Sequence, residues 1–249
     1  MARPWPEGKD DQMLTRILLK ARKAARRARS LLWHQDPVTA VSRESWLQKA
    51  QEGEFQFHVR DKWRPSDDFA RQSRLLFEHF GLPRDRFENK TVVDLGAGSK
   101  LRSKYFSKSR LIAIEPLAER FLREIPWCDL KEAAEVYPVP AEQRIEGLVG
   151  RADLLVSINV LDHCYDFETI IENIREYLHP EGLAFLSFDK HKWADEMHPL
   201  ELTEETCAEI FARKGLQIQK ASTGFGRVLG TTQTYGHGPY CMNNWLTKR

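Results

Sequence analysis

Short apolar runs alternate with amphipathic stretches along most of the chain after residue 88. The runs are rich in valine, leucine and isoleucine and lie at positions 91–95, 111–115, 136–139, 153–158, 183–188 and 216–221. Three intervening stretches carry apolar residues at spacings of three and four, as helices packed on one face do: 117–125, 167–178 and 202–214. Strands that alternate with helices predict a doubly wound α/β sheet. With a final antiparallel strand near 240–247, which follows a long glycine-rich loop, we expect seven strands.

The first part of the chain follows a different pattern. Over 13–33, apolar residues fall at helical spacings and Lys and Arg crowd the other positions. Residues 1–33 hold nine Lys or Arg and three acids, a charge of +6, which leaves −4 for the rest of a chain whose net charge is +2. We therefore predict a basic amphipathic helical extension over 1–33, a helical cap region over 34–88 and the α/β domain over 89–249.

The basic helix has three interpretations. It can lie on an anionic membrane, where each cation near the surface contributes ~1 kcal/mol. It can follow a phosphate backbone. It can also pack on its own domain or a partner with its basic face in water. The alanines on its apolar side, such as Ala21, Ala25 and Ala28, weaken the membrane interpretation.

Composition limits the class of protein. The 249 residues suffice for one domain with additions, and no apolar run approaches the roughly 20 residues that span a bilayer. The first residues lack the apolar core of a signal peptide, so we expect a cytoplasmic protein, with 13–33 as a candidate peripheral contact at the inner membrane surface. Homo-oligomerisation stays open. The cysteines are far apart and are expected to be reduced thiols: Cys128, Cys164, Cys207 and Cys241.

The run at 91–95 ends in an acid and leads into two glycines. Asp94 precedes Gly96 and Gly98, and Ala97 stands between the glycines. Glycine at these positions permits a positive φ and a close approach of the backbone to a ligand. A dinucleotide fingerprint requires a third glycine at 101, where this chain has leucine. We therefore expect a ligand-binding turn that is not the dinucleotide type.

The next apolar run closes with Glu115, followed by Pro116. Its distance from the glycines suits an acid that binds the two hydroxyls of a ribose. At this point the chain resembles the class I, Rossmann-like, S-adenosylmethionine-dependent methyltransferases. The segments Asp-Leu-Gly-Ala-Gly and Ile-Glu-Pro are similar to the first and second motifs of that family. The resemblance extends over roughly 90–220, about half of the chain.

The resemblance implies S-adenosylmethionine as the cofactor and a set of residues around it. The implied cofactor-binding residues are Asp94, Gly96, Ala97, Gly98, Glu115, Pro116, Ala141, Glu142 and Asn159. Ala141 and Glu142 match the family's Ala-Glu pair beside the adenine. The chain departs from the family pattern at Lys100, which stands where a third glycine is common, and in its short first helix, near 101–107. Lys100 or Arg102 is expected to assist backbone N–H groups in binding the methionine carboxylate.

The segment Asn-Val-Leu-Asp-His at 159–163 follows the run at 153–158. Open α/β sheets bind ligands at the carboxyl ends of their strands. The segment resembles the Asn-x-Leu-x-His stretch of many small-molecule methyltransferases. An alcohol acceptor needs help to lose its proton, and we expect His163, or else Asp162, to act as the base. The alternative is that His163 only orients a loop.

Further candidates lie where the acceptor would bind. In the family the N-terminal part covers the cofactor and shapes the acceptor pocket. The substrate-contact candidates are His58, His191, Trp193, His198 and Tyr235. Asp189, His191 and His198 carry metal-ligand chemistry, but their spacing fits no compact ligand motif, so no metal is predicted.

Two absences narrow the substrate class. No Asn/Asp-Pro-Pro-Tyr follows the run at 153–158, and no Pro-Cys pair stands there, so nucleic-acid bases are poor candidates. The resemblance is strongest to methyltransferases of glycan and secondary metabolism. We expect O-methylation of a sugar, a polysaccharide precursor or another small hydroxylated metabolite. The alternatives are N- or C-methylation of a natural product, and a non-catalytic cofactor-binding or membrane-recruited module.

Overall fold

A computed structural model describes residues 42–60, 67–190, 197–227 and 234–249, with side chains except at 45 and 224–240. These residues all belong to one compact unit, Thr39–Arg249. No helix among them is both long and apolar enough to cross a bilayer. The basic helix predicted over 13–33 lies outside the described ranges.

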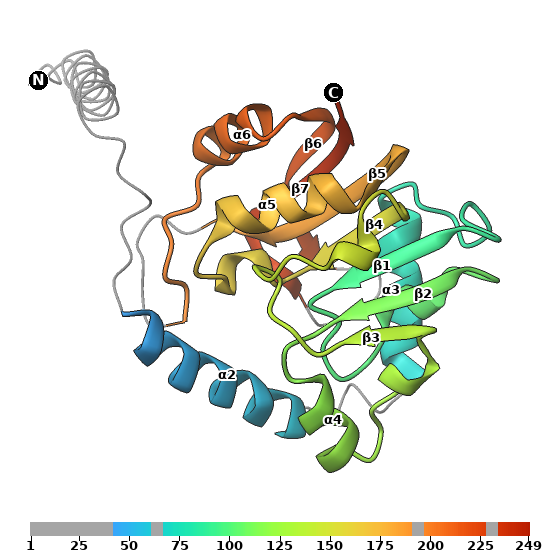
Figure 1. Ribbon diagram of the computed structural model, residues 1–249, viewed down its shortest axis with the longest axis vertical. Coiled ribbons are helices and arrows are strands. Elements are labelled where there is room, and N and C mark those ends of the chain that lie inside the picture. Colours follow the sequence, from blue (N-terminus) through green and yellow to red (C-terminus); the bar gives the residue numbers. More distant parts are fainter. Residues whose placement is uncertain (1–41, 61–66, 191–196, 228–233) are drawn as a thin grey trace, which may run out of the picture. The chain divides into compact units, whose positions relative to one another are not determined.

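The described residues form one mixed seven-stranded sheet with helices on both faces (Figure 1). The strands are β1 Thr91–Leu95, β2 Arg110–Ile114, β3 Glu135–Tyr137, β4 Ala152–Ile158, β5 Leu178–Asp189, β6 Leu216–Arg227 and β7 Thr234–Lys248. Their order is β3-β2-β1-β4-β5-β7-β6. Strands β1 to β5 run parallel, and β7 lies antiparallel between β5 and β6. The direction in which successive strands are added reverses between β1 and β4. Doubly wound sheets bind their ligands in the crevice at the carboxyl ends of the strands at such a point.

Successive side chains of a strand point to opposite faces of the sheet, and helices cover both faces. The α-helices are α2 Arg43–Arg60, α3 Asp67–His79, α4 Ala118–Glu124, α5 Phe167–Tyr177 and α6 Glu204–Arg213. On β1, Val93 joins one apolar core with α5 and α6, whereas Val92 joins the other with α3 and α4. Both valines are fully buried, as expected for a parallel sheet covered on both faces.

Short helical turns connect the strands at the sheet edges. They are η1 Arg102–Tyr105, η2 Leu130–Glu132, η3 Glu146–Leu148 and η4 Leu161–His163. The helix expected over 101–107 is therefore a 3-10 turn of four residues. The helix expected over 167–178 is α5, and Asp166 caps it, with Oδ1 accepting the Thr169 N–H at 3.0 Å.

Two predictions about the later strands were wrong in extent. The turn expected at 179–182 is part of β5, where the register with β4 shifts between Ala152 and Leu154. The long loop expected in the glycine-rich tail is largely strand, because β6 and β7 pair as extended antiparallel neighbours. Glycine lowers strand propensity without preventing ladder hydrogen bonds, so the tertiary pairing overrides the local signal.

Candidate active site

The turn after β1 is shaped by Gly96. Its φ is +72°, and a Cβ there would stand 2.4 Å from the Val160 side chain, so steric crowding by the β4 edge demands glycine. The N–H groups of Gly96 and Ala97 both donate to the Ile114 carbonyl, at 2.8 and 3.3 Å. The turn therefore folds over the end of β2 and lies against the segment after β4.

Two buried acids hold this turn. Glu115 accepts the Gly98 N–H at 2.8 Å through Oε2 and the Leu117 N–H at 3.0 Å through Oε1. Asp94 accepts the Ser103 N–H at 3.1 Å. Burial raises the pKa of the Asp94 carboxyl, and the hydrogen bonds from Ser103 oppose that rise. Both carboxyl groups line the same cavity.

Asp129 fixes the segment that follows the glycines. Its Oδ1 accepts the Leu101 N–H at 2.7 Å, and its Oδ2 lies 3.6 Å from the Lys100 ammonium and 3.1 Å from that of Lys104. Lys100, which stands where the family often has glycine, is therefore held by an ion pair. Arg102 also borders the cavity, with its guanidinium 4.7 Å from the Phe69 ring centroid.

A turn after β3 forms another wall of the cavity. Ala141 and Glu142 line it, and their carbonyl groups accept hydrogen bonds from the Asn173 amide of α5 at 2.9 and 3.1 Å. The Glu142 carboxylate accepts the Tyr165 N–H at 3.3 Å. Both members of the predicted pair therefore face the cavity from a turn that α5 supports.

The end of β4 supplies the polar end of the cavity. Asn159 has a φ of +58°, a conformation that asparagine tolerates better than most residues, and its N–H donates to the Ser187 carbonyl at 2.7 Å. Beyond it, Asp162 is 1% exposed, and its Oδ2 lies 3.7 Å from His163 Nε2. His198 comes from the segment after β5, with its ring centroid 4.6 Å from that of His163.

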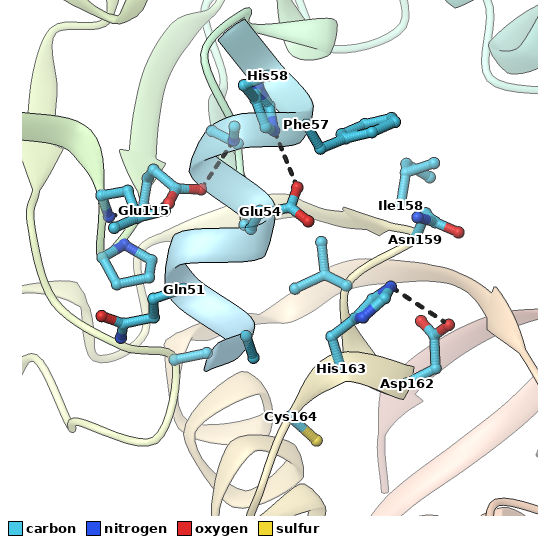
Figure 2. Close-up of a pocket in the computed structure, with 18 of the residues that line it drawn as sticks. Gln51, Glu54, Phe57, His58, Glu115, Ile158, Asn159, Asp162, His163 and Cys164 are labelled. Carbon is cyan, nitrogen blue, oxygen red and sulfur yellow. Dashed lines mark hydrogen bonds and ion pairs between the residues drawn. The ribbon is translucent and has the colours of Figure 1, made fainter. Parts of the chain in front are cut away.

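Helix α2 extends along the cavity and contacts three of its walls. Near its start Trp46 lies 5.8 Å from Tyr165 between ring centroids. Further along, Phe55 stacks on Phe121 of α4 at 5.9 Å. Near its end His58, 1% exposed, places Nδ1 2.7 Å from the Ser99 hydroxyl. Figure 2 shows α2 between Glu115 on one side and the Asp162–His163 pair on the other.

These walls enclose a cavity of about 980 Å³. Thirteen of the predicted site residues line it: Asp94, Gly96, Ala97, Gly98, Glu115, Pro116, Ala141, Glu142, Asn159, Asp162, His163, His58 and His198. His191 and Trp193 lie outside the described residues. Tyr235 belongs to β7, and its side chain is outside the description. The structure thus brings all nine predicted cofactor-binding residues, the two predicted catalytic residues and two of the five acceptor candidates to one cavity.

Several residues that shape the site were missed in the sequence. Phe57 is 55% exposed and extends from α2 into the cavity (Figure 2). Asp129 and Asn173 form hydrogen bonds with the backbone of the cavity walls and belong to no sequence motif. An aromatic residue beside His58 in a predicted helical segment was a usable signal for Phe57, whereas the other two depend on tertiary contacts alone.

Three features define the class of fold: the strand order, the antiparallel β7 and the glycine turn beside β2. The chain has the Rossmann-like fold of class I S-adenosylmethionine-dependent methyltransferases. A solved structure of a Burkholderia thailandensis 1,6-didemethyltoxoflavin-N1-methyltransferase, with 1,6-didemethyltoxoflavin and S-adenosylhomocysteine bound, is similar with a TM-score of 0.54 and 19% identity over 85% of this chain and 93% of that one.

Two further solved structures share the fold. A mitomycin 7-O-methyltransferase matches with a TM-score of 0.52 and 16% identity, over 82% of this chain and 68% of that one. A methyltransferase from Clostridium acetobutylicum matches with a TM-score of 0.55 and 10% identity, over 80% and 99%. No family model matches the sequence, and no curated protein does. At these identities the likeness is one of fold.

Proposed function

We propose that this chain is an S-adenosylmethionine-dependent methyltransferase. The observation that carries the proposal is Glu115, a buried carboxylate at the end of β2 that both lines the cavity and holds the glycine turn of β1. A carboxylate accepts up to about four hydrogen bonds, so two ribose hydroxyls would share Glu115 with the Gly98 and Leu117 N–H groups. The solved relatives of this fold support the same assignment.

The other walls of the cavity suit the remaining parts of the cofactor. Ala141 and Glu142 would border the adenine. The guanidinium of Arg102, beside the glycine turn, would attract the methionine carboxylate, with Lys100 held in place by Asp129. Once bound, the cofactor supplies a methyl sulfonium, an electrophile that is already activated. The protein's task is then to align the acceptor and take its proton.

We propose that His163 takes that proton. Its side chain is 29% exposed, lines the cavity and has Nε2 3.7 Å from Oδ2 of the buried Asp162. Proton acceptance by the imidazole would leave the acceptor oxygen free to attack the methyl group of a bound cofactor, with S-adenosylhomocysteine as the leaving group. His198, whose ring centroid lies 4.6 Å from that of His163, would contact the acceptor from the same end of the cavity.

The acceptor class follows from the polarity of this end of the cavity. Asn159, Asp162 and two histidines favour a hydroxylated molecule, so we propose O-methylation of a sugar, a polysaccharide precursor or another small hydroxylated metabolite. The exposed ring of Phe57 suits a flat or ring-shaped acceptor. N-methylation is the competing proposal, because the bound toxoflavin precursor of one relative is methylated at nitrogen.

An acceptor screen with isotopically labelled S-adenosylmethionine tests the assignment. Transfer to hydroxylated acceptors is expected. In His163→Gln, turnover should fall about 10²-fold or more, while affinity for S-adenosylhomocysteine is retained. Transfer only to nitrogen acceptors would replace the O-methylation proposal. Unchanged turnover in His163→Gln would remove this residue as the base.

We also propose the division into an extension over 1–33, a cap over 34–88 and a catalytic domain over 89–249. Residues 13–33 would contact an anionic membrane surface or a partner protein. Co-sedimentation with vesicles rich in phosphatidylserine, compared between the full chain and one lacking 1–33, tests the membrane contact. Equal binding by both proteins would contradict it.

A further inference from the structure

Three side chains with metal-ligand chemistry meet at the polar end of the cavity. Among the described residues, Asp162, His163 and His198 form a group in which one ligand atom from each lies within 4.8 Å of the others. Asp162 and His163 come from η4, and His198 comes from the segment after β5. The fold therefore assembles the cluster from separate parts of the chain.

The spacing of the cluster suits an ion. When all three separations are at most 4.8 Å, a central ion lies within about 2.8 Å of each ligand atom, and a side-chain shift of under ~1 Å gives bonds of about 2.0–2.2 Å. The two imidazole rings stand 4.6 Å apart between centroids.

The donor set of the cluster also suits an ion. Asp162 is 1% exposed, and its carboxylate is the one oxygen donor of the three. His163 Nε2 lies 3.7 Å from its Oδ2, longer than a hydrogen bond. Two nitrogen donors and one oxygen donor on one side of an open cavity are typical of sites that leave coordination positions for a substrate.

We propose that Asp162, His163 and His198 bind a divalent transition-metal ion such as Zn²⁺ or Fe²⁺. Imidazole ligands favour these ions over Mg²⁺ and Ca²⁺, which take oxygen ligands. The open positions of the ion face the cavity and take oxygen atoms of the acceptor, most effectively two neighbouring hydroxyls. The cluster thereby narrows the acceptor class to diols and related chelating molecules.

This inference rests on the proposed function for the identity of the acceptor, but not for the binding of the ion. With the ion bound, the His163 nitrogen is a ligand and positions the ion. The acceptor O–H is then weakened by the cation, and its proton leaves to solvent water. The base role of His163 is confined to the metal-free protein.

Calorimetric titration of the metal-free full-length protein with Zn²⁺, without cofactor or acceptor, tests the site. One ion per chain is expected to bind with micromolar or tighter affinity. His163→Gln, His198→Gln and Asp162→Asn should each weaken binding at least about tenfold. His179→Gln, an exposed histidine in β5, is the matched control and should bind as the unmodified chain does.

Cobalt substitution provides a second measurement on the same variants. The visible absorption of bound Co²⁺ should report nitrogen and oxygen ligands and be lost in His163→Gln and His198→Gln while circular dichroism stays unchanged. Absence of stoichiometric Zn²⁺ and Co²⁺ binding by the unmodified folded protein would overturn the inference, as would equal binding by the three site variants. Metal binding without S-adenosylhomocysteine binding in a parallel titration would instead reject the proposed function alone.

Discussion

The imidazole of His58 is hydrogen bonded to Ser99 in the glycine turn after β1, with Nδ1 2.7 Å from the hydroxyl oxygen and 3.2 Å from the backbone nitrogen. Because a backbone N–H can only donate, Nδ1 is the acceptor, and Nε2 carries the proton that Glu54 Oε1 accepts at 2.9 Å. Helix α2 is thus tied to the glycine turn by a buried histidine, 41 residues away in the chain.

Replacing His58 by phenylalanine should loosen that connection. Phenylalanine keeps the ring contact with Phe121, whose centroid is 4.6 Å away, but leaves the buried Ser99 groups without their acceptor. Such a loss costs about 1–3 kcal/mol, so affinity for S-adenosylhomocysteine should fall about tenfold and amide exchange in α2 should accelerate. His79→Phe, at the exposed end of α3, is the control. Equal affinity in the two variants would show that α2 closes the cavity without His58.

Gly96→Ala should destabilise the protein for two separable reasons. A positive φ costs roughly 1–2 kcal/mol for alanine, and the new Cβ would stand 2.4 Å from Val160. Gly81 has nearly the same φ, +73°, and a Cβ added there would have no neighbouring atom within 4 Å. Gly81→Ala therefore measures the backbone cost alone. We expect urea unfolding to show a loss of about 3–5 kcal/mol for Gly96→Ala and about 1–2 kcal/mol for Gly81→Ala.

The double variant Gly96→Ala/Val160→Ala checks the steric part. Removal of the valine methyl groups should restore part of the stability lost in Gly96→Ala. If the two substitutions are simply additive, Val160 does not cause the crowding.

The sequence predicted the sheet well because its signals are local. Buried parallel strands are continuous apolar runs, and the caps and glycines mark where they end. The extent of β6 and β7 could not be predicted, because each strand is specified by its pairing with the other. Motif residues such as Glu115 were found by their spacing. Asp129 was missed because its effect on the Leu101 N–H depends on a contact across 28 positions.

Phe57→Ala should affect the acceptor and not the fold. The side chain is 55% exposed, so its removal should change the free energy of unfolding by less than about 0.5 kcal/mol. If the ring contacts the acceptor, KM for the acceptor should rise about tenfold while affinity for S-adenosylhomocysteine stays constant. Unchanged KM for every acceptor would place the acceptor away from α2.

Glu135 should make stability depend on pH in the acid range. Hydrogen bonds and charge from Arg151, together with Tyr137 and Arg110, lower the pKa of its carboxyl from 4.5 to about 2. The ionised form is favoured in the folded state, so this stability is complete above pH 4.5 and is lost as pH falls toward 2. Because the side chain is 23% exposed, solvent screening reduces the effect at pH 7 to about 1–2 kcal/mol.

Glu135→Gln should therefore be less stable than the unmodified protein at pH 7, with the difference narrowing between pH 5 and about pH 3. Urea unfolding across this range measures it. Glu181→Gln, an exposed acid in β5, is the control. A difference that stays constant with pH would mean that the ion pairs of Glu135 do not set its contribution.

We propose that the cavity beside Glu115 binds S-adenosylmethionine. Calorimetric titration with S-adenosylhomocysteine, with NAD as the control ligand, tests it most directly. We expect micromolar binding of S-adenosylhomocysteine, no binding of NAD, and at least about tenfold weaker binding in Glu115→Gln, which loses the charge but keeps the size of the side chain. Failure of the folded, unmodified protein to bind S-adenosylhomocysteine, or equal affinity in Glu115→Gln, would contradict it.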